Sequence, residues 1–162
     1  MSDNVYLGNP NLKKANTPIE FTEEQIIEFV QCQRDPVYFA NKYVKIVSLD
    51  EGLVPFTPYR FQEKLINNFH ENRFNICKMP RQTGKSTTVV SYLLHYAIFN
   101  DSVNIGILAN KAATARELLG RLQTAYENLP KWMQQGIMVW NKGSLELENG
   151  SKILAASTSA SA

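Results

Sequence analysis

The sequence is poor in the features that define secreted, membrane-spanning or metal-bound proteins. It has two cysteines, Cys32 and Cys77, which form no metal-ligand pattern. No apolar run is long enough to span a bilayer, and the N-terminus lacks the basic start and apolar stretch of a secretory signal. We therefore expect an intracellular, non-secreted protein without membrane contact, whose two thiols are reduced and partly buried.

The sequence also lacks a large excess of positive or negative charge. The 162 residues include 17 lysines and arginines against 15 acidic residues, which gives a net charge of +2. A dedicated nucleic-acid-binding domain usually carries a denser basic patch. If DNA is a partner, this chain is not expected to supply the main grip. The length and the 44% hydrophobic content suit one globular domain with its own core.

The first third of the chain predicts an arm followed by short helices. Residues 1–20 contain turns rich in proline and asparagine and show little periodicity, so we expect an arm that packs on something or stays mobile. Residues 22–25 (TEEQ) have the spacing of a capping box and predict a helix start. Pro36, after an aspartate, predicts the first turn of a second helix, and Pro58, after a threonine, that of a third.

The middle of the chain alternates between strand and helix patterns. Residues 74–79 predict a strand, residues 85–99 a helix that is apolar nearly all round, and residues 103–109 a second strand. Another helix with regular apolar spacing follows and ends before Pro130. This alternation predicts a parallel α/β sheet.

The end of the chain predicts a β-hairpin or meander. Short strands are expected at residues 137–140, 144–148 and 152–155, and the Asn-Gly pair at 149–150 is a strong hairpin turn.

Residues 79–86 (MPRQTGKS) come close to the phosphate-binding loop G-x-x-x-x-G-K-[ST], although Met79 stands where the first glycine is usual. Gly84 allows the tight turn that directs backbone N–H groups at phosphate oxygens from a helix N-terminus. Lys85 would place its charge on the β- and γ-phosphates, and Ser86 would offer a hydroxyl to Mg²⁺. The tripeptide alone is weak evidence, and a surface turn with an incidental lysine is the alternative. Its position between a strand and a buried helix favours the phosphate loop.

Side chains around this loop have a functional and a plain interpretation. Arg81 is either a solvated loop residue or an arginine finger supplied in cis. The Gln62 amide could complement the adenine N6 and N7 atoms while Phe61 packs on the base, or the two could be an exposed glutamine and a core phenylalanine. The full set of expected ATP-binding residues is Phe61, Gln62, Arg81, Gln82, Thr83, Gly84, Lys85, Ser86 and Thr87.

Four other titratable residues are expected to be structural only. His70 and His95 each stand alone on a helix, without a carboxylate or cysteine partner at ligand spacing. Glu146 and Glu148 alternate with leucines, so we expect them on the solvent face of a strand and not as a catalytic pair.

The phosphate loop, with Arg-Gln inside it and no first glycine, resembles that of the large terminase subunits of tailed bacteriophages. Four further segments resemble terminases of the T-even type, so the similarity covers nearly the whole chain from about Gly8. They are residues 8–15 (GNPNLKKA), 34–40 (RDPVYFA), 106–111 (GILANK) and 140–151 (WNKGSLELENGS).

Large terminases join an N-terminal packaging ATPase to a C-terminal nuclease, cut concatemeric DNA and pump it into the capsid. The resemblance therefore implies ATP and Mg²⁺ as cofactors. It implies double-stranded DNA, the portal protein and the small terminase subunit as partners of a homo-oligomeric ring, docked on the procapsid in the host cytoplasm. By position, Phe61 and Gln62 match the adenine-binding segment. Lys85 and Ser86 match the phosphate and Mg²⁺ ligands, and Arg81 matches the cis finger, so Lys85 and Arg81 are the expected catalytic residues.

One departure from the family is large. No run of four apolar residues followed by an acidic pair, the Walker B pattern, occurs after Ser86. Residues 46–51 (IVSLDE) have similar letters but precede the loop. We expect the front part of a terminase, cut within its ATPase domain, that binds nucleotide with little or no turnover. Because flanking strands are missing, we also expect it to be marginally stable, prone to aggregation, or completed by another polypeptide.

The fold expected from these features is α/β. It is a P-loop NTPase with an incomplete ASCE-type parallel sheet, a helical N-terminal segment and a C-terminal β-hairpin or meander. Residues 1–56 would form the arm and helical subdomain, and residues 57–162 the partial ATPase core. The alternatives are a helicase-like DNA-dependent ATPase and a non-enzymatic, truncated interaction module.

Overall fold

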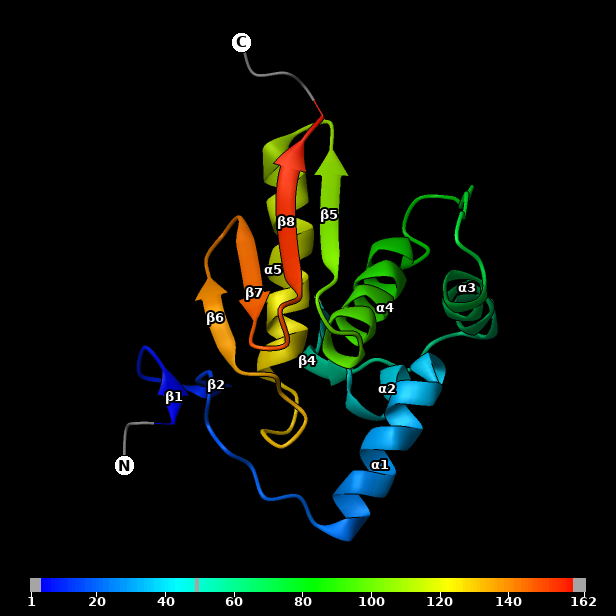
Figure 1. The fold of residues 1–162 in the computed structure, drawn as a ribbon. Helices are drawn as coiled ribbons and strands as arrows, with labels where there is room; N and C mark the ends of the chain where they lie inside the picture. The colour runs from blue at the N-terminus through cyan, green and yellow to red at the C-terminus, as the bar shows by residue number, and fades with distance from the viewer. Residues whose placement is uncertain (1–3, 49, 159–162) are drawn as a thin grey trace.

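The computed structural model describes residues 4–48 and 50–158 and shows a mixed α/β fold (Figure 1). The helices are α1 (Glu23–Arg34), α2 (Pro36–Tyr43), α3 (Arg60–Glu71), α4 (Lys85–Phe99) and α5 (Ala112–Glu127). The strands are β1 (Val5–Tyr6), β2 (Asn9–Lys13), β3 (Lys45–Ser48), β4 (Gly52–Pro55), β5 (Asn104–Ala109), β6 (Ile137–Trp140), β7 (Ser144–Leu147) and β8 (Lys152–Ser157). In this part of the chain, no helix is both long and apolar enough to cross a bilayer.

The main sheet has the strand order β5-β8-β7-β6 and is mixed (Figure 1). The strands β5 and β8 run parallel in register from Asn104 opposite Lys152 to Ala109 opposite Ser157. The pairs β7–β8 and β6–β7 are antiparallel. The predicted strands of this region and the Asn-Gly hairpin turn are confirmed, and Gly150 takes the positive φ of 82° that this turn requires. The parallel pairing that the strand–helix alternation predicts is limited to β5 and β8.

The core lies between this sheet and the helices α4 and α5. The helix α5 packs on β5 and β8, and α4 packs on α5. The helix α4 is buried along most of its length, as its apolar sequence predicts. Fully buried side chains from α4, α5 and the sheet meet here, among them Leu94, Leu119, Leu122, Leu145 and Ile153.

The predicted caps of the first two helices are confirmed. Thr22 and Gln25 form a capping box at the start of α1. The Asp35 carboxylate accepts hydrogen bonds from the backbone N–H groups of Val37 and Tyr38, each 2.9 Å long, and Pro36 is the first residue of α2.

The predicted start of the third helix at Pro58 is wrong by two residues. The helix α3 begins at Arg60, with Tyr59 as its N-cap residue. The Gln62 side chain reaches back, and its Oε1 accepts a hydrogen bond of 2.9 Å from the Tyr59 N–H. This bond satisfies an N–H that the helix itself leaves free, which explains why the helix begins here.

The first two helices are joined through the carboxylate of Glu28. It accepts hydrogen bonds from the hydroxyls of Tyr43 (2.9 Å) and Tyr38 (3.2 Å), and the Lys42 ammonium lies 2.8 Å away. Cys32, one turn further along α1, is fully buried, and burial raises the pKa of its thiol to about 12. Cys32 is thus a free, buried thiol, as expected, and its raised pKa keeps it unreactive.

The N-terminal arm is packed rather than mobile over its described residues. Leu12 is fully buried, and the Lys13 backbone N–H donates a hydrogen bond of 3.0 Å to the Gln134 side chain. Lys14 also forms an isolated bridge with Ile137 at the start of β6. The arm thus contacts a part of the chain more than 100 residues away in sequence.

Glu148 ties the arm to the sheet, so its predicted place on a solvent-exposed strand face is wrong. Its carboxylate accepts hydrogen bonds from the Gly136 N–H (2.7 Å), the Asn16 N–H (2.8 Å) and the Lys13 ammonium (3.0 Å). Burial alone would raise the pKa of Glu148, but these three donors outweigh it and hold the pKa below its ordinary value. The strand β7 ends at Leu147, which frees the next side chain to turn inward.

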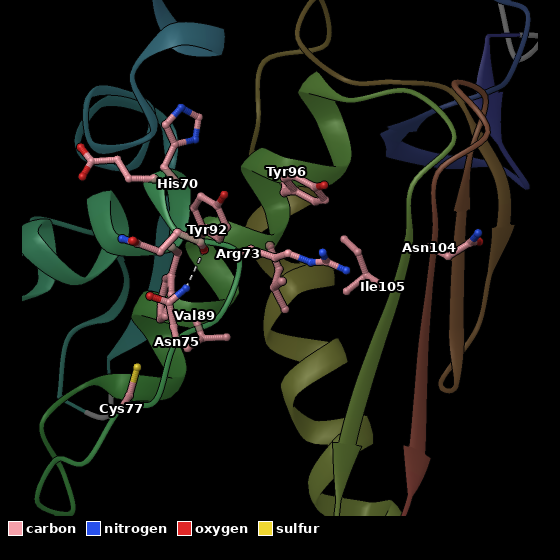
Figure 2. Close-up of a pocket in the computed structure, with 13 residues that line it drawn as sticks. His70, Arg73, Asn75, Cys77, Val89, Tyr92, Tyr96, Asn104 and Ile105 are labelled. Carbon is pink, nitrogen blue, oxygen red and sulfur yellow. Dashed lines mark hydrogen bonds between the residues drawn. The ribbon is translucent and has the colours of Figure 1, made fainter.

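The predicted strand at residues 74–79 is absent, since this segment has no regular secondary structure and pairs with no strand among the described residues. Phe74 is 81% exposed and Ile76 is 98% exposed. Cys77 is exposed too, contrary to the expected partial burial. A cavity of about 710 Å³ separates the segment from β5; Figure 2 shows Asn75 and Cys77 on one side and Ile105 on the other, with side chains of α4 between them. A strand needs a hydrogen-bonded neighbour, and β5 is too far away to serve as one.

His95 is a core residue, as the sequence predicts. It is 2% exposed, and its Nε2 lies 2.8 Å from the Cys32 carbonyl oxygen, so Nε2 carries the proton. Its ring packs against Phe39, Tyr92 and Phe99. Burial lowers the pKa of His95 to about 4 because the charged imidazolium would lose its hydration.

We predict that Glu148→Gln lowers the free energy of unfolding by roughly 1–3 kcal/mol. The substitution removes the negative charge and one of the two oxygens that accept hydrogen bonds from three donors. Glu146→Gln is the matched control, because the ion pair of Glu146 with Lys152 is largely exposed and should contribute below about 1 kcal/mol. Urea unfolding of both variants measures the difference. Equal effects of the two changes would contradict the role given to Glu148.

We also predict that the melting temperature falls as the pH is lowered from 6.5 towards 4. In that window the unfolded chain binds a proton that the folded His95 does not, so folding stability is lost as the pH falls. His95→Gln keeps a donor for the Cys32 carbonyl and does not titrate. Above about pH 5, where most carboxylates remain ionised, this variant should show a flatter melting profile in calorimetry. An unchanged slope would show that other groups cause the pH dependence.

Candidate functional site

The candidate site is built where residues 79–86 turn into the buried helix α4. Gly84 is the N-cap residue of α4 and has a left-handed backbone with φ of 72° and ψ of 18°. Gln82 also has a positive φ, of 60°, which costs a non-glycine residue on the order of 1 kcal/mol. The loop therefore keeps a strained shape in front of a helix N-terminus. The free N–H groups and the dipole of that terminus favour an anion.

Lys85 folds back over this loop. Its ammonium donates hydrogen bonds to the carbonyl oxygens of Met79 (3.0 Å) and Pro80 (2.5 Å). The Thr83 hydroxyl donates to the same Pro80 carbonyl at 3.0 Å. The cation is thus held at the loop, half-buried, by neutral acceptors that an anionic ligand could replace.

Gln62 supports the loop from behind. Its side chain is 4% exposed, and its Nε2 donates a hydrogen bond of 3.4 Å to the Thr83 carbonyl. A Cβ atom at Gly84 would lie 2.5 Å from the same Nε2. Gly84 suits this position because its left-handed backbone disfavours other residues and because a Cβ would displace this amide.

A cavity of about 590 Å³ lies beside the loop. Gln62, Gln82, Thr83, Gly84 and Thr87 line one side of it. The aromatic rings of Tyr59 and Phe61 line another side and stack on each other with centroids 5.9 Å apart and planes 10° apart. Both rings are well exposed, at 71% and 45%. The cavity thus has a flat, accessible aromatic wall next to a loop that ends at a helix N-terminus.

The hairpin of β3 and β4 lines a further side of this cavity with Ile46 and Pro55. These two residues and Tyr59 were not among the expected site residues. Tyr59 could have been found from sequence, because it stands two residues before Phe61 at the start of the same helix. Ile46 and Pro55 carry no sequence signal of their own, since only the tertiary fold brings the hairpin here.

The remaining expected residues lie around the loop without lining this cavity. Ser86 is exposed in the first turn of α4, and with Lys85 it borders a separate, smaller cavity of about 260 Å³. Arg81 is exposed and makes no hydrogen bond or ion pair within residues 4–48 and 50–158. Over the same residues, no group of three or more His, Cys, Asp or Glu side chains is arranged to hold a metal ion.

A comparison with models of known protein families identifies the family of the chain. The family model described as "Terminase large subunit, T4likevirus-type, N-terminal" matches residues 76–162, which is more than half of the chain. The match includes residues 79–86, α4, α5 and the whole main sheet, but not Phe61 and Gln62. The chain therefore belongs to the family of large terminase subunits of the T4-like type, whose role is the packaging of phage DNA.

Proposed function

We propose that this chain is the ATP-binding part of a phage DNA-packaging motor and that residues 79–86 form its phosphate loop. The observation that carries the proposal is the position of Lys85. Its ammonium lies at the N-terminus of a buried helix, directly after a left-handed glycine, and within the described residues it bonds only to loop carbonyls. The triphosphate oxygens would take the place of these carbonyls, and the helix N-terminus would add its backbone donors.

The cavity beside the loop is proposed to hold the nucleoside. Its volume of about 590 Å³ falls within the range of small-molecule sites. Phe61 and Gln62 belong to its lining, as do Gln82, Thr83, Gly84 and Thr87. A base lying against the aromatic pair would leave its phosphates directed towards Lys85 at the end of the loop.

Ser86 is the proposed protein ligand for Mg²⁺. Its exposed hydroxyl, one residue after Lys85, is an oxygen donor of the kind that this ion prefers, and phosphate oxygens and water would complete the shell. When bound, Mg²⁺ neutralises charge on the β- and γ-phosphates. Arg81 is exposed in the same loop and has no protein partner among the described residues, so its guanidinium is available to act as the proposed cis finger.

The core is proposed to be a P-loop NTPase of the ASCE type with one strand position open. The strand β5 lies at the edge of the sheet, and the segment 74–79, on the other side of a cavity of about 710 Å³, pairs with no strand of the described chain. A further strand between them would pair with both. It would also bring the acidic residues that hydrolysis needs, so we expect the chain as it stands to bind ATP with little or no turnover.

Membership of the terminase family implies DNA and components of the packaging complex as partners in general. We propose the specific partners to be double-stranded DNA, the portal protein and the small terminase subunit. The complete protein would act as a homo-oligomeric ring docked on the procapsid in the host cytoplasm. The family match favours packaging over a helicase-like role, and the nucleotide test below separates it from a non-enzymatic interaction module.

We predict that Lys85→Ala weakens ATP binding by about 10- to 100-fold, as expected for the loss of charge-assisted hydrogen bonds to phosphate. Lys142→Ala is the matched control, since Lys142 is exposed in the turn between β6 and β7. Calorimetric titration with ATP and Mg²⁺ measures both. Equal affinities of the two variants would contradict the assignment of the phosphate loop, and hydrolysis at a motor-like rate would contradict the expected lack of turnover.

We predict that the purified chain associates as its concentration rises, because an unpaired sheet edge and exposed apolar side chains favour contact between chains. Ile76→Lys should reduce association, since Ile76 is 98% exposed in the unpaired segment. Leu7→Lys should not, although Leu7 is 88% exposed, because it lies on the arm. Light scattering after size exclusion measures the mass. A monomer with a cooperative melt at high temperature would contradict the open strand position.

A further inference from the structure

Gln62 has a different set of contacts from the one that adenine recognition would require. Reading the N6 and N7 atoms of adenine takes one acceptor and one donor of the amide, both facing the base. Here Oε1 accepts from the Tyr59 N–H at 2.9 Å, and Nε2 donates to the Thr83 carbonyl at 3.4 Å. Both ends of the amide are thus used within the protein, and the side chain is 4% exposed.

The contacts of the Gln62 Nε2 are with the proposed phosphate loop. Nε2 lies against the backbone of Gly84, so close that a Cβ atom there would be 2.5 Å away. Thr83 and Gly84 are the two residues before Lys85, and Gly84 must keep its left-handed φ of 72° for α4 to start in the right direction. Gln62 therefore contacts and hydrogen-bonds the part of the loop that contains the left-handed residue Gly84.

The same side chain also holds the aromatic pair. Its bond to the Tyr59 N–H fixes the start of α3, and the Gln62 N–H donates to the Tyr59 carbonyl at 2.7 Å. Tyr59 stacks on Phe61, so the first turn of α3 and the phosphate loop are connected through one buried amide. A change in either element is passed to the other through a side chain that has little room to move.

We propose that Gln62 is a positioning residue, which keeps the phosphate loop in its phosphate-binding shape and does not read the base. This inference rests on the proposed function of the loop. Base recognition is then left to the accessible rings of Tyr59 and Phe61, which offer a flat apolar surface to any purine. The consequence is that loss of Gln62 weakens the binding of the phosphates themselves, whatever base they carry.

The test compares three ligands on the full chain: ATP, GTP and inorganic tripolyphosphate, each titrated with Mg²⁺ by calorimetry. Gln62→Met keeps the length of the side chain and removes the amide. It should weaken all three ligands by the same factor, roughly tenfold, with unchanged stoichiometry. Phe61→Ala should weaken ATP and GTP and leave tripolyphosphate unaffected. Gln33→Met, an exposed glutamine of α1, is the control and should change nothing.

The stoichiometry separates positioning from a general loss of folding, because unfolded chain lowers the number of sites and not the affinity of those that remain. A loss restricted to ATP would overturn the inference and make Gln62 a reader of adenine. Unchanged affinity for tripolyphosphate in Gln62→Met would overturn it as well. If the unaltered chain binds none of the three ligands, or if Lys85→Ala leaves tripolyphosphate binding intact, the proposed function fails and this inference fails with it.

Discussion

The left-handed backbone of Gly84 is the constraint on which the site depends. It turns the chain from an exposed loop into α4, a helix buried along most of its length, and so fixes where the helix N-terminus opens. Lys85 can lie over the loop only because this turn places it in the first residue of the helix. A Cβ at this position would lie 2.5 Å from the Gln62 Nε2, so the amide would have to move away from the loop. One glycine thus determines the direction of the helix, the place of the cation and the contact with α3.

Three hydrogen-bonded side chains, the buried Gln134 and the half-buried Glu148 and Glu28, hold separate parts of the chain together. Glu148 joins the N-terminal arm to the end of β7, and Gln134 adds bonds to the arm through the backbone of Lys13 and Asn11. Glu28 joins α1 to α2. Polar groups that are buried must be paired, so each of these side chains specifies its neighbours more narrowly than an apolar contact would. None of these three side chains contacts the edge strand β5 through the hydrogen bonds named here, so they stabilise the fold independently of that edge.

The loop at residues 79–86 is held by hydrogen bonds on both sides, whereas the segment before it is not. The loop is held by contacts to α3 and to its own carbonyls, which are all present in the described residues. The segment 74–79 would need a neighbouring strand, and across a cavity it has none. Residues 79–86 therefore keep their shape although the segment before them has no strand partner among the described residues.

The sequence by itself determined the features that depend on neighbours along the chain. The caps at Thr22 and Asp35, the apolar α4, the Asn-Gly turn and the tight turn at Gly84 follow from signals within a few residues. Only the tertiary structure decided the rest. Glu148 was expected in solvent because its donors come from residues 13, 16 and 136, which no local pattern connects. The segment 74–79 has the composition of a strand, but a strand exists only where another strand supplies its hydrogen bonds. Gln62 was expected to face a ligand, and its partners, Tyr59 and Thr83, became visible only once α3 and the loop were placed side by side.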